Sequence, residues 1–297
     1  MPPIPQEVFD LYDKYAHNQL DRRGFVKQLS VYAVGGLTVS GLLNHLLPDY
    51  ENKIQVRADD PRLDADTVEY TTPATGITMR GLLARPVNAT NKLPGIIVVH
   101  ENRGLNPYIE DVVRRAAVAN FISFGPDALT PLGGYPGNDD EGRAMQRKRD
   151  RAEMLEDFIA AYEFLRHHPE CTGQVGVVGF CFGGAISNQM AVRLPELGAA
   201  VPFYGSQPPA EDVPAIQAPL LIQYGELDER VNKGWPDYEA ALKANDKNYT
   251  AHVYPGANHG FHNDTTPRYD EAAAKLAWER TITFFDEHLR QREMPSE

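Results

Sequence analysis

The chain has 297 residues, of which 42% are hydrophobic, and its formal net charge is −12. This length and hydrophobic content suffice for one large α/β domain or two small ones. The negative charge disfavours nucleic acids and anionic membrane surfaces as partners, because both would repel the chain.

The N-terminal sixty residues contain a pattern typical of export. Arg22 and Arg23 are followed by Phe25, Lys27 and a mostly uncharged stretch over 29–47. This pattern resembles a twin-arginine signal, and the use of that signal would place the protein in the periplasm. A permanent transmembrane span is not expected, because glycines and polar residues dilute a run that is barely long enough to cross a bilayer.

The same segment equally favours a helical arm that stays on the mature protein. Phe25, Leu29, Tyr32 and Gly36 fall at helical spacing. The only candidate cleavage point, after Ala58, is weak. Residues 1–60 are therefore either an export signal or a retained arm, and in the second case the protein is expected in the cytoplasm.

Residues 61–297 are expected to form one domain, because short apolar runs alternate there with longer amphipathic stretches. This alternation predicts a mostly parallel sheet with helices on both faces. The expected strands, in chain order, are TVEYTTP and RGLLARP as an antiparallel pair, then GIIVVH, FISFGPD, VGVVGF, AAVPFYG, PLLIQYG and TAHVYPG. Helices are expected over 107–119, 143–167, from the end of VGVVGF to about 193, near 235–245 and over 268–289.

The strand VGVVGF runs into a turn centred on Cys181, with Gly179 and Gly183 two positions away on each side. Gly-x-Cys-x-Gly is the cysteine form of the nucleophile elbow, in which a strained turn exposes the central side chain above the sheet. A side chain at either glycine would collide with neighbouring backbone in so sharp a turn. The alternative is a small apolar cysteine packed at a strand end.

The second cysteine, Cys171, lies at the other end of the same expected strand. The two residues would then be about 25 Å apart, whereas a disulfide needs α-carbons within about 7 Å. We therefore expect Cys181 to be a free thiol. The same distance excludes a zinc site built on both cysteines.

Two later loops contain the partners that a nucleophilic thiol needs. Asp228 follows the strand PLLIQYG and His259 follows TAHVYPG, so both are expected at the sheet edge where Cys181 emerges. Asp228 would orient His259, and His259 would exchange protons with Cys181 and the leaving group. Taken singly, Asp228 could be a helix cap and His259 a surface residue. His262 lacks a further ligand at a recognisable spacing, so we expect no metal and no cofactor.

With GFCFGG around Cys181, and with intervals of 47 residues to Asp228 and 31 more to His259, the sequence resembles the dienelactone hydrolase family over about residues 66–288. Known members are cysteine-dependent α/β hydrolases that open unsaturated cyclic lactones. The resemblance implies the α/β-hydrolase fold and a Cys181, Asp228 and His259 triad. It also implies that no cofactor is needed.

The resemblance also implies a functional role for the segment VVHENRGLN. Glu101 matches a family glutamate that contacts the resting thiol and helps to remove its proton. A buried ion pair between Glu101 and Arg103 is the alternative role. The resemblance also implies an oxyanion hole formed by the backbone amides of Phe182 and Asn102. These amides would stabilise the negative charge that develops on the substrate oxygen.

Two departures from the family limit the substrate assignment. The best-known members carry arginines that hold the lactone carboxylate, but the matching segments here read PDALTPLGG and HGFHN, with Asn263 in the second. Arg103 could replace them as an anion clamp, or it could serve only as the structural partner of Glu101.

The expected function is that of a carboxymethylenebutenolidase-like hydrolase, which cleaves a small-molecule lactone or carboxylic ester through a Cys181 acyl-enzyme. Two alternatives stay open. The acyl donor could be a thioester, or the protein could be a non-catalytic binding or redox protein that uses only the Cys181 thiol. The physiological substrate and the oligomeric state do not follow from the sequence.

Overall fold

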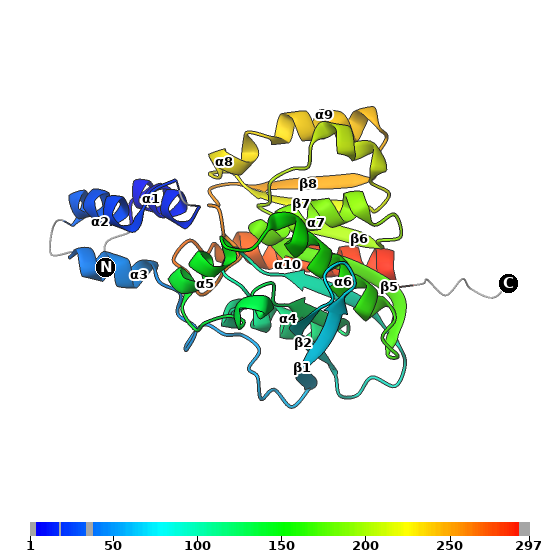
Figure 1. Cartoon of the computed structure of the whole chain (residues 1–297). Helices are drawn as coiled ribbons and strands as arrows, with labels where there is room; N and C mark the ends of the chain where they lie inside the picture. Colours follow the sequence, from blue (N-terminus) through cyan, green and yellow to red (C-terminus); the bar gives the residue numbers. More distant parts are fainter. Residues whose placement is uncertain (1–3, 18, 34–37, 291–297) are drawn as a thin grey trace.

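The computed structural model of the chain describes residues 4–17, 19–33 and 38–290. Its centre is an eight-stranded sheet with the order β1-β2-β4-β3-β5-β6-β7-β8 (Figure 1). The strands are β1 (Leu63–Thr72), β2 (Ile77–Pro86), β3 (Leu93–Val99), β4 (Ile122–Pro126), β5 (Cys171–Phe180), β6 (Ala199–Phe203), β7 (Leu220–Gly225) and β8 (Tyr249–Tyr254). As expected, β1 and β2 pair antiparallel. The six strands β4, β3, β5, β6, β7 and β8, neighbours in that order, run parallel to one another.

The middle strand β3 explains why the sheet is covered on both sides. Every residue of β3 is buried. Ile96 and Val98 join the hydrophobic core on one face, whereas Ile97 and Val99 join the core on the other. Since successive side chains of a strand point to opposite faces, a strand that is apolar throughout needs helices on both sides.

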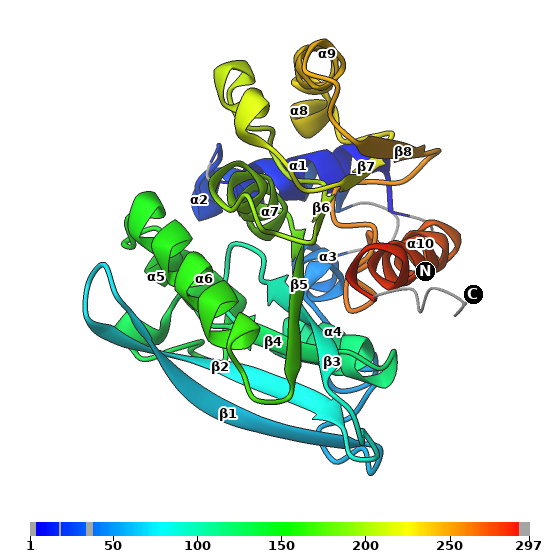
Figure 2. The ribbon, with the colours of Figure 1, turned by 90° about the vertical axis from the view of Figure 1, so that its right-hand side faces the viewer.

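Helices supply both covers (Figure 2). α4 (Pro107–Val118) and α10 (Glu271–Leu289) pack on one face, and α6 (Arg151–Arg166), α7 (Phe182–Arg193) and α9 (Trp235–Ala244) contribute to the core on the other. The remaining elements of the domain are α5 (Asp139–Gln146), α8 (Glu229–Asn232) and the 3₁₀ helices η2 (Thr130–Leu132) and η3 (Ala210–Ala215). The predicted fold class is confirmed.

The helix predicted over 143–167 is in fact two helices, α5 and α6. The helix is interrupted before Asp150, which caps the start of α6. Its carboxylate accepts hydrogen bonds from the amides of Ala152 at 2.8 Å and Glu153 at 3.1 Å. An aspartate in this position satisfies the first free amides of a new helix. The break places several side chains of 143–151 along the cavity described below.

The N-terminal residues form a helical arm with α1 (Gln6–Ala16), α2 (Arg22–Leu29), η1 (Ser30–Tyr32) and α3 (Val39–Leu46). The arm has its own small core, in which the predicted Phe25 and Leu29 are both buried. Gly36, the last residue of the predicted helical spacing, lies outside the described residues. None of the helices in the described part of the chain is long and apolar enough to cross a membrane.

Candidate active site

Cys181 stands at the turn between β5 and α7, and its backbone is strained. Its φ of 57° and ψ of −110° lie in a region that non-glycine residues rarely adopt. A β-carbon on Gly179 would come within 2.0 Å of the Gly183 carbonyl oxygen, and one on Gly183 within 2.2 Å of the Val99 oxygen. The two glycines thus allow the close approach that the predicted elbow requires. Cys181 and Cys171 are both free thiols, as predicted.

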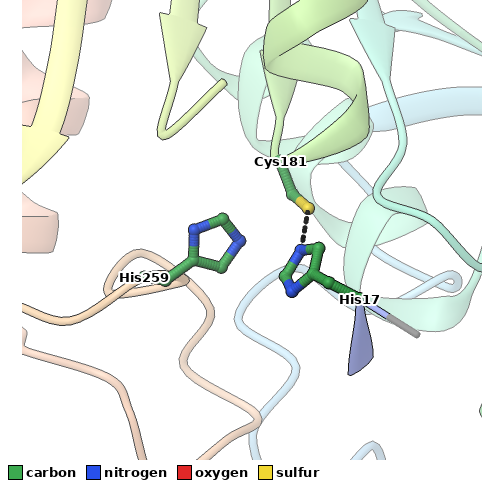
Figure 3. A group of neighbouring side chains, drawn as sticks. All are labelled: His17, Cys181 and His259. Atoms are coloured by element: carbon green, nitrogen blue, oxygen red, sulfur yellow. Dashed lines mark hydrogen bonds between the residues drawn. The ribbon is translucent and has the colours of Figure 1, made fainter. Parts of the chain in front are cut away.

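The structure brings Asp228 and His259 together beside Cys181. Asp228 follows β7, and its Oδ2 lies 2.5 Å from His259 Nδ1. Its other oxygen accepts a hydrogen bond from the amide of Val231 at 3.2 Å, so Asp228 also caps α8. His259 Nε2 is buried and has no hydrogen-bond partner among the described residues. In Figure 3 the His259 ring faces the Cys181 sulfur.

A third group reaches the sulfur from a part of the chain that the sequence did not point to. His17, at the end of α1, has its Nε2 3.2 Å from Cys181 Sγ (Figure 3). Asp13 lies one helical turn earlier, and its Oδ1 is 3.0 Å from His17 Nδ1. The i, i+4 spacing of Asp13 and His17 was the one available signal, and such a pair is common on exposed helix faces.

The charged groups around Cys181 and His259 shift the pKa values of both side chains. Burial raises the pKa of the Cys181 thiol, but the charges of His17 and His259 outweigh burial and lower this pKa to about 5. Burial lowers the pKa of His259, whereas Asp228 and the thiolate raise it to about 10. The favoured state at neutral pH is therefore a thiolate beside an imidazolium.

Glu101 and Arg103 form the buried ion pair that the sequence left as an alternative. Glu101 Oε2 lies 3.2 Å from an Arg103 nitrogen, and Arg103 also contacts Asp139 at 2.8 Å. Asn263, which stands where the family has an arginine, donates its side-chain amide to Glu101 at 3.2 Å. Glu101 thus contacts Arg103 and Asn263, and it is His17 that contacts the sulfur of Cys181.

The two amides expected to form an oxyanion hole come from separate strand ends. Phe182 is the first residue of α7, and the first amides of a helix have no partner within it. Asn102 follows β3, and its side chain donates to the carbonyl oxygen of Ala16 at 2.8 Å. This bond ties the end of α1 to the loop after β3.

A cavity of about 350 Å³ opens beside Cys181. His17 and Tyr204 line it together with Cys181 and Phe182. The arginines in its lining are Arg143, Arg147, Arg149, Arg151 and Arg230. Three of these arginines also pair with carboxylates: Arg143 with Asp140, Arg149 with Asp157 and Arg230 with Asp13.

The ligand atoms of His17, Cys181 and His259 lie within 4.8 Å of one another, a donor set that could hold a metal ion. No pattern in the sequence predicts this grouping, because His17 is 164 residues from Cys181. His262, the other histidine considered as a ligand, is instead buried with its Nδ1 2.7 Å from the Tyr108 hydroxyl.

Comparisons with known proteins identify the family. A model described as dienelactone hydrolase family matches residues 79–289, and one described as YqhI-like matches residues 2–34. A putative carboxymethylenebutenolidase of Saccharolobus solfataricus is 30% identical, and the match covers 70% of this chain and 94% of that protein. A probable 2-oxo-3-(5-oxofuran-2-ylidene)propanoate lactonase of Bradyrhizobium sp is also 30% identical, with 70% and 88% covered.

Among solved structures, a putative dienelactone hydrolase from Klebsiella pneumoniae subsp. pneumoniae MGH 78578 is 27% identical, with a TM-score of 0.68, and the match covers 75% of this chain and 99% of that one. The α/β-hydrolase fold and the hydrolase class predicted from the sequence are confirmed by these matches. The chain is therefore a hydrolase that belongs to the dienelactone hydrolase family.

Proposed function

We propose that the protein hydrolyses a lactone or a small carboxylic ester through an acyl-enzyme on Cys181. The observation that carries the proposal is the thiol on a strained elbow beside a buried histidine, whose Nδ1 is held by Asp228 at 2.5 Å. Among the residues that the structure describes, none forms a hydrogen bond with His259 Nε2, which suits a group that exchanges protons with a substrate.

The chemistry follows from this arrangement. The Cys181 thiolate attacks the carbonyl carbon, a carbon–sulfur bond forms, and the bond to the leaving oxygen breaks as that oxygen takes a proton from the His259 imidazolium. Neutral His259 then removes a proton from water, which attacks the thioester and releases the thiolate. The products are a carboxylic acid, which loses its proton to solvent, and an alcohol. For a lactone both groups belong to one molecule.

The backbone amides of Phe182 and Asn102 are proposed to bind the oxyanion. Each comes from the carboxyl end of a parallel strand, where open α/β sheets bind their ligands. Two donors aimed at the developing charge would lower the barrier by several kcal/mol, on the scale of about 3 kcal/mol for one donor.

The cavity supports a small substrate that carries a negative charge. Its volume of about 350 Å³ is at the lower end of the range for small-molecule sites. Its arginine-rich wall favours an acyl group with a carboxylate, because guanidinium groups bind carboxylates in a bidentate way. The substrate would share Arg143, Arg149 and Arg230 with the carboxylates of Asp140, Asp157 and Asp13. These arginines come from 143–151 and from Arg230, not from the two segments in which the family places them. Arg103 stays in its buried pairs with Glu101 and Asp139.

Trapping of the intermediate tests the proposal. The full-length protein is mixed with an activated aryl ester and quenched in acid within the first turnover, and its peptides are analysed by mass spectrometry. We expect the acyl group on the peptide that contains Cys181, with Cys171→Ala giving the same adduct. An acyl group on another residue, or full hydrolysis by Cys181→Ala, would contradict the mechanism.

A panel of substrates separates the alternatives. Lactones, aryl esters and acyl thioesters, each with and without a carboxylate, are compared by kcat/KM. The proposal expects lactones or esters with a carboxylate to be preferred. A preference for thioesters would favour the second type of hydrolase, and a lack of turnover on the whole panel would favour a binding or redox role for Cys181.

A further inference from the structure

The N-terminal arm brings a second histidine–carboxylate pair to the sulfur. His17 Nε2 lies 3.2 Å from Cys181 Sγ, and the His17 and His259 rings stand edge to face with 4.9 Å between their centroids (Figure 3). The thiol is thus contacted from two sides by two different parts of the chain. A nucleophile with one histidine already has a base for its chemistry, so the second histidine needs an explanation.

Asp13 gives His17 a defined orientation. Its Oδ1 and its backbone oxygen lie 3.0 Å and 2.9 Å from His17 Nδ1, so the proton on Nδ1 points into the helix and Nε2 points to the sulfur. Burial lowers the pKa of His17, but the Cys181 thiolate and Asp13 outweigh it and raise this pKa. A carboxylate that orients an imidazole against a nucleophile is the arrangement found in catalytic triads.

The end of α1 is anchored to the domain at several points. The Asn102 side chain donates to the Ala16 carbonyl oxygen at 2.8 Å, and Arg230 Nε donates to Asp13 at 3.1 Å. The Arg268 guanidinium lies over the Tyr12 ring, 4.9 Å from its centroid. Asn102, Arg230 and Arg268 lie in the segments that follow β3, β7 and β8, so the segments that form the site also fix the position of His17.

We infer that His17 is a catalytic residue that takes the proton of the Cys181 thiol and holds it as an imidazolium beside the resting thiolate. The inference rests on the acyl-enzyme mechanism proposed above. The S–H bond breaks, the proton moves to His17 Nε2, and the electron pair stays on sulfur. His259 is then free to serve the leaving group and the water. Asp13 is a positioning residue, because it acts through His17.

Three negative and four positive groups, counting His17 itself, lie at the site in this state. The groups that face His17 are Asp13 on its own helix and Cys181, Arg230 and His259 across the site. The thiolate, Asp13 and Asp228 are negative, whereas His17, His259 and Arg230 are positive. Arg268, 3.8 Å from Asp13, adds a further positive charge behind the carboxylate. A thiolate is therefore the protonation state that this set of groups favours.

Two other roles for the cluster are a metal site and an arm that blocks the site. The charge of Arg230, whose Nη2 atom lies 3.1 Å from His17 Nε2 and 3.3 Å from His259 Nδ1, opposes a metal ion no more than it opposes an imidazolium, so the Zn²⁺ measurement below decides between these two states. An arm that only blocks the site should fill it. His17 instead lines the cavity of about 350 Å³ that stays open beside Cys181.

The test measures alkylation of Cys181 by iodoacetamide as a function of pH, in full-length wild type, His17→Gln and Asp13→Asn. His45→Gln is the matched control, because His45 is an exposed histidine on α3 of the same arm. Without His17 the thiol pKa should rise from about 5, and a rise to about 7 would lower the rate at about pH 6 by about 10-fold, because the rate follows the thiolate fraction. The rate above about pH 9, where the thiol ionises by itself, should change little.

The outcomes separate this inference from the mechanism on which it rests. Hydrolysis by Cys181→Ala would remove the mechanism, whereas a wild-type alkylation profile in His17→Gln would remove only the role of His17. Faster ester hydrolysis in His17→Gln would show an inhibitory arm and would also overturn the inference. The inference would also be overturned if one equivalent of Zn²⁺ protected Cys181 from alkylation in the wild type but not in His17→Gln. If His17→Gln melts early, the Asp13→Asn profile gives the same decision.

Discussion

Two carboxylate–histidine pairs meet at Cys181, and they differ in how the fold supports them. Asp228 and His259 stand on loops at the ends of β7 and β8, and their side chains are only 2% and 6% exposed. Asp13 and His17 stand on the last turn of α1, with side chains 18% and 17% exposed. The first pair belongs to the sheet and the second to an arm that reaches the sheet by docking.

The difference indicates how the two pairs divide the work. The sheet-borne pair has a short contact of 2.5 Å, and its outer histidine nitrogen has no hydrogen-bond partner within the described part of the chain, which suits proton exchange with each substrate. The arm-borne pair already has its outer nitrogen in contact with the sulfur and with Arg230. A base that is occupied in this way suits a single task, the maintenance of the thiolate.

The largest expected effect on activity comes from a substitution in the sheet-borne pair, Asp228 and His259. Asp228→Asn should lower kcat for ester hydrolysis by about 10⁴-fold, because an amide favours the wrong tautomer of the histidine that serves every turnover. Asp13→Asn should lower it by only about 2-fold at neutral pH, since a rise of the thiol pKa from about 5 to about 7 still leaves about half of Cys181 as the thiolate. Steady-state kinetics on both variants measure the comparison, and equal losses would show that the two pairs share one task.

A carboxylate outside both pairs provides the next test. Glu101→Gln should lower the free energy of unfolding by about 3 kcal/mol or more, because it leaves the buried Arg103 with one charged partner fewer. Glu156→Gln, which breaks a partly exposed pair with Arg193 at 2.9 Å, should cost less than about 1 kcal/mol. Urea unfolding measures both values.

The same Glu101→Gln protein tests the role that the family implies for this residue. If His17 maintains the thiolate, the acylation rate in a single turnover should stay within about 3-fold of wild type, well short of the effect of losing a base. A loss of about 10²-fold or more, without a matching loss in His17→Gln, would assign the proton transfer to Glu101 and would break the comparison drawn above.

The sheet-borne half of the site could be predicted from sequence because its signals are local. Cys181 directly follows a parallel strand, Asp228 and His259 lie in the loops that follow two others, and parallel strands end at one edge of the sheet. The structure places Asp228 and His259 together there and brings Cys181 beside them. Their roles in catalysis stay a prediction until the variants are measured.

The arm-borne half could not be predicted because nothing local records where a helix docks. Asp13 and His17 look like any surface pair on an amphipathic helix, and their partners Cys181 and Arg230 are 164 and 213 residues away. The split between α5 and α6 was missed for a related reason. A charged run with helical spacing continues through 147–150, and only the capping bonds of Asp150 show that a new helix begins there.

The smallest expected effect concerns the two possible fates of the arm. Arg22 lies on α2 with its side chain 75% exposed, and its one recorded ion pair, with Asp140, is long at 3.7 Å. Replacement of Arg22 and Arg23 by Lys keeps the charge, so ester hydrolysis by the purified variant should change by less than about 2-fold. The same variant should fail to leave the cytoplasm if the arginines act as an export signal, since that pathway reads the arginine pair itself.

N-terminal sequencing of the active wild-type protein completes the test. If His17 serves the thiol, the active form must still carry α1. An active form that begins after Ala58 would lack both Asp13 and His17, and the thiol would then depend on His259 alone.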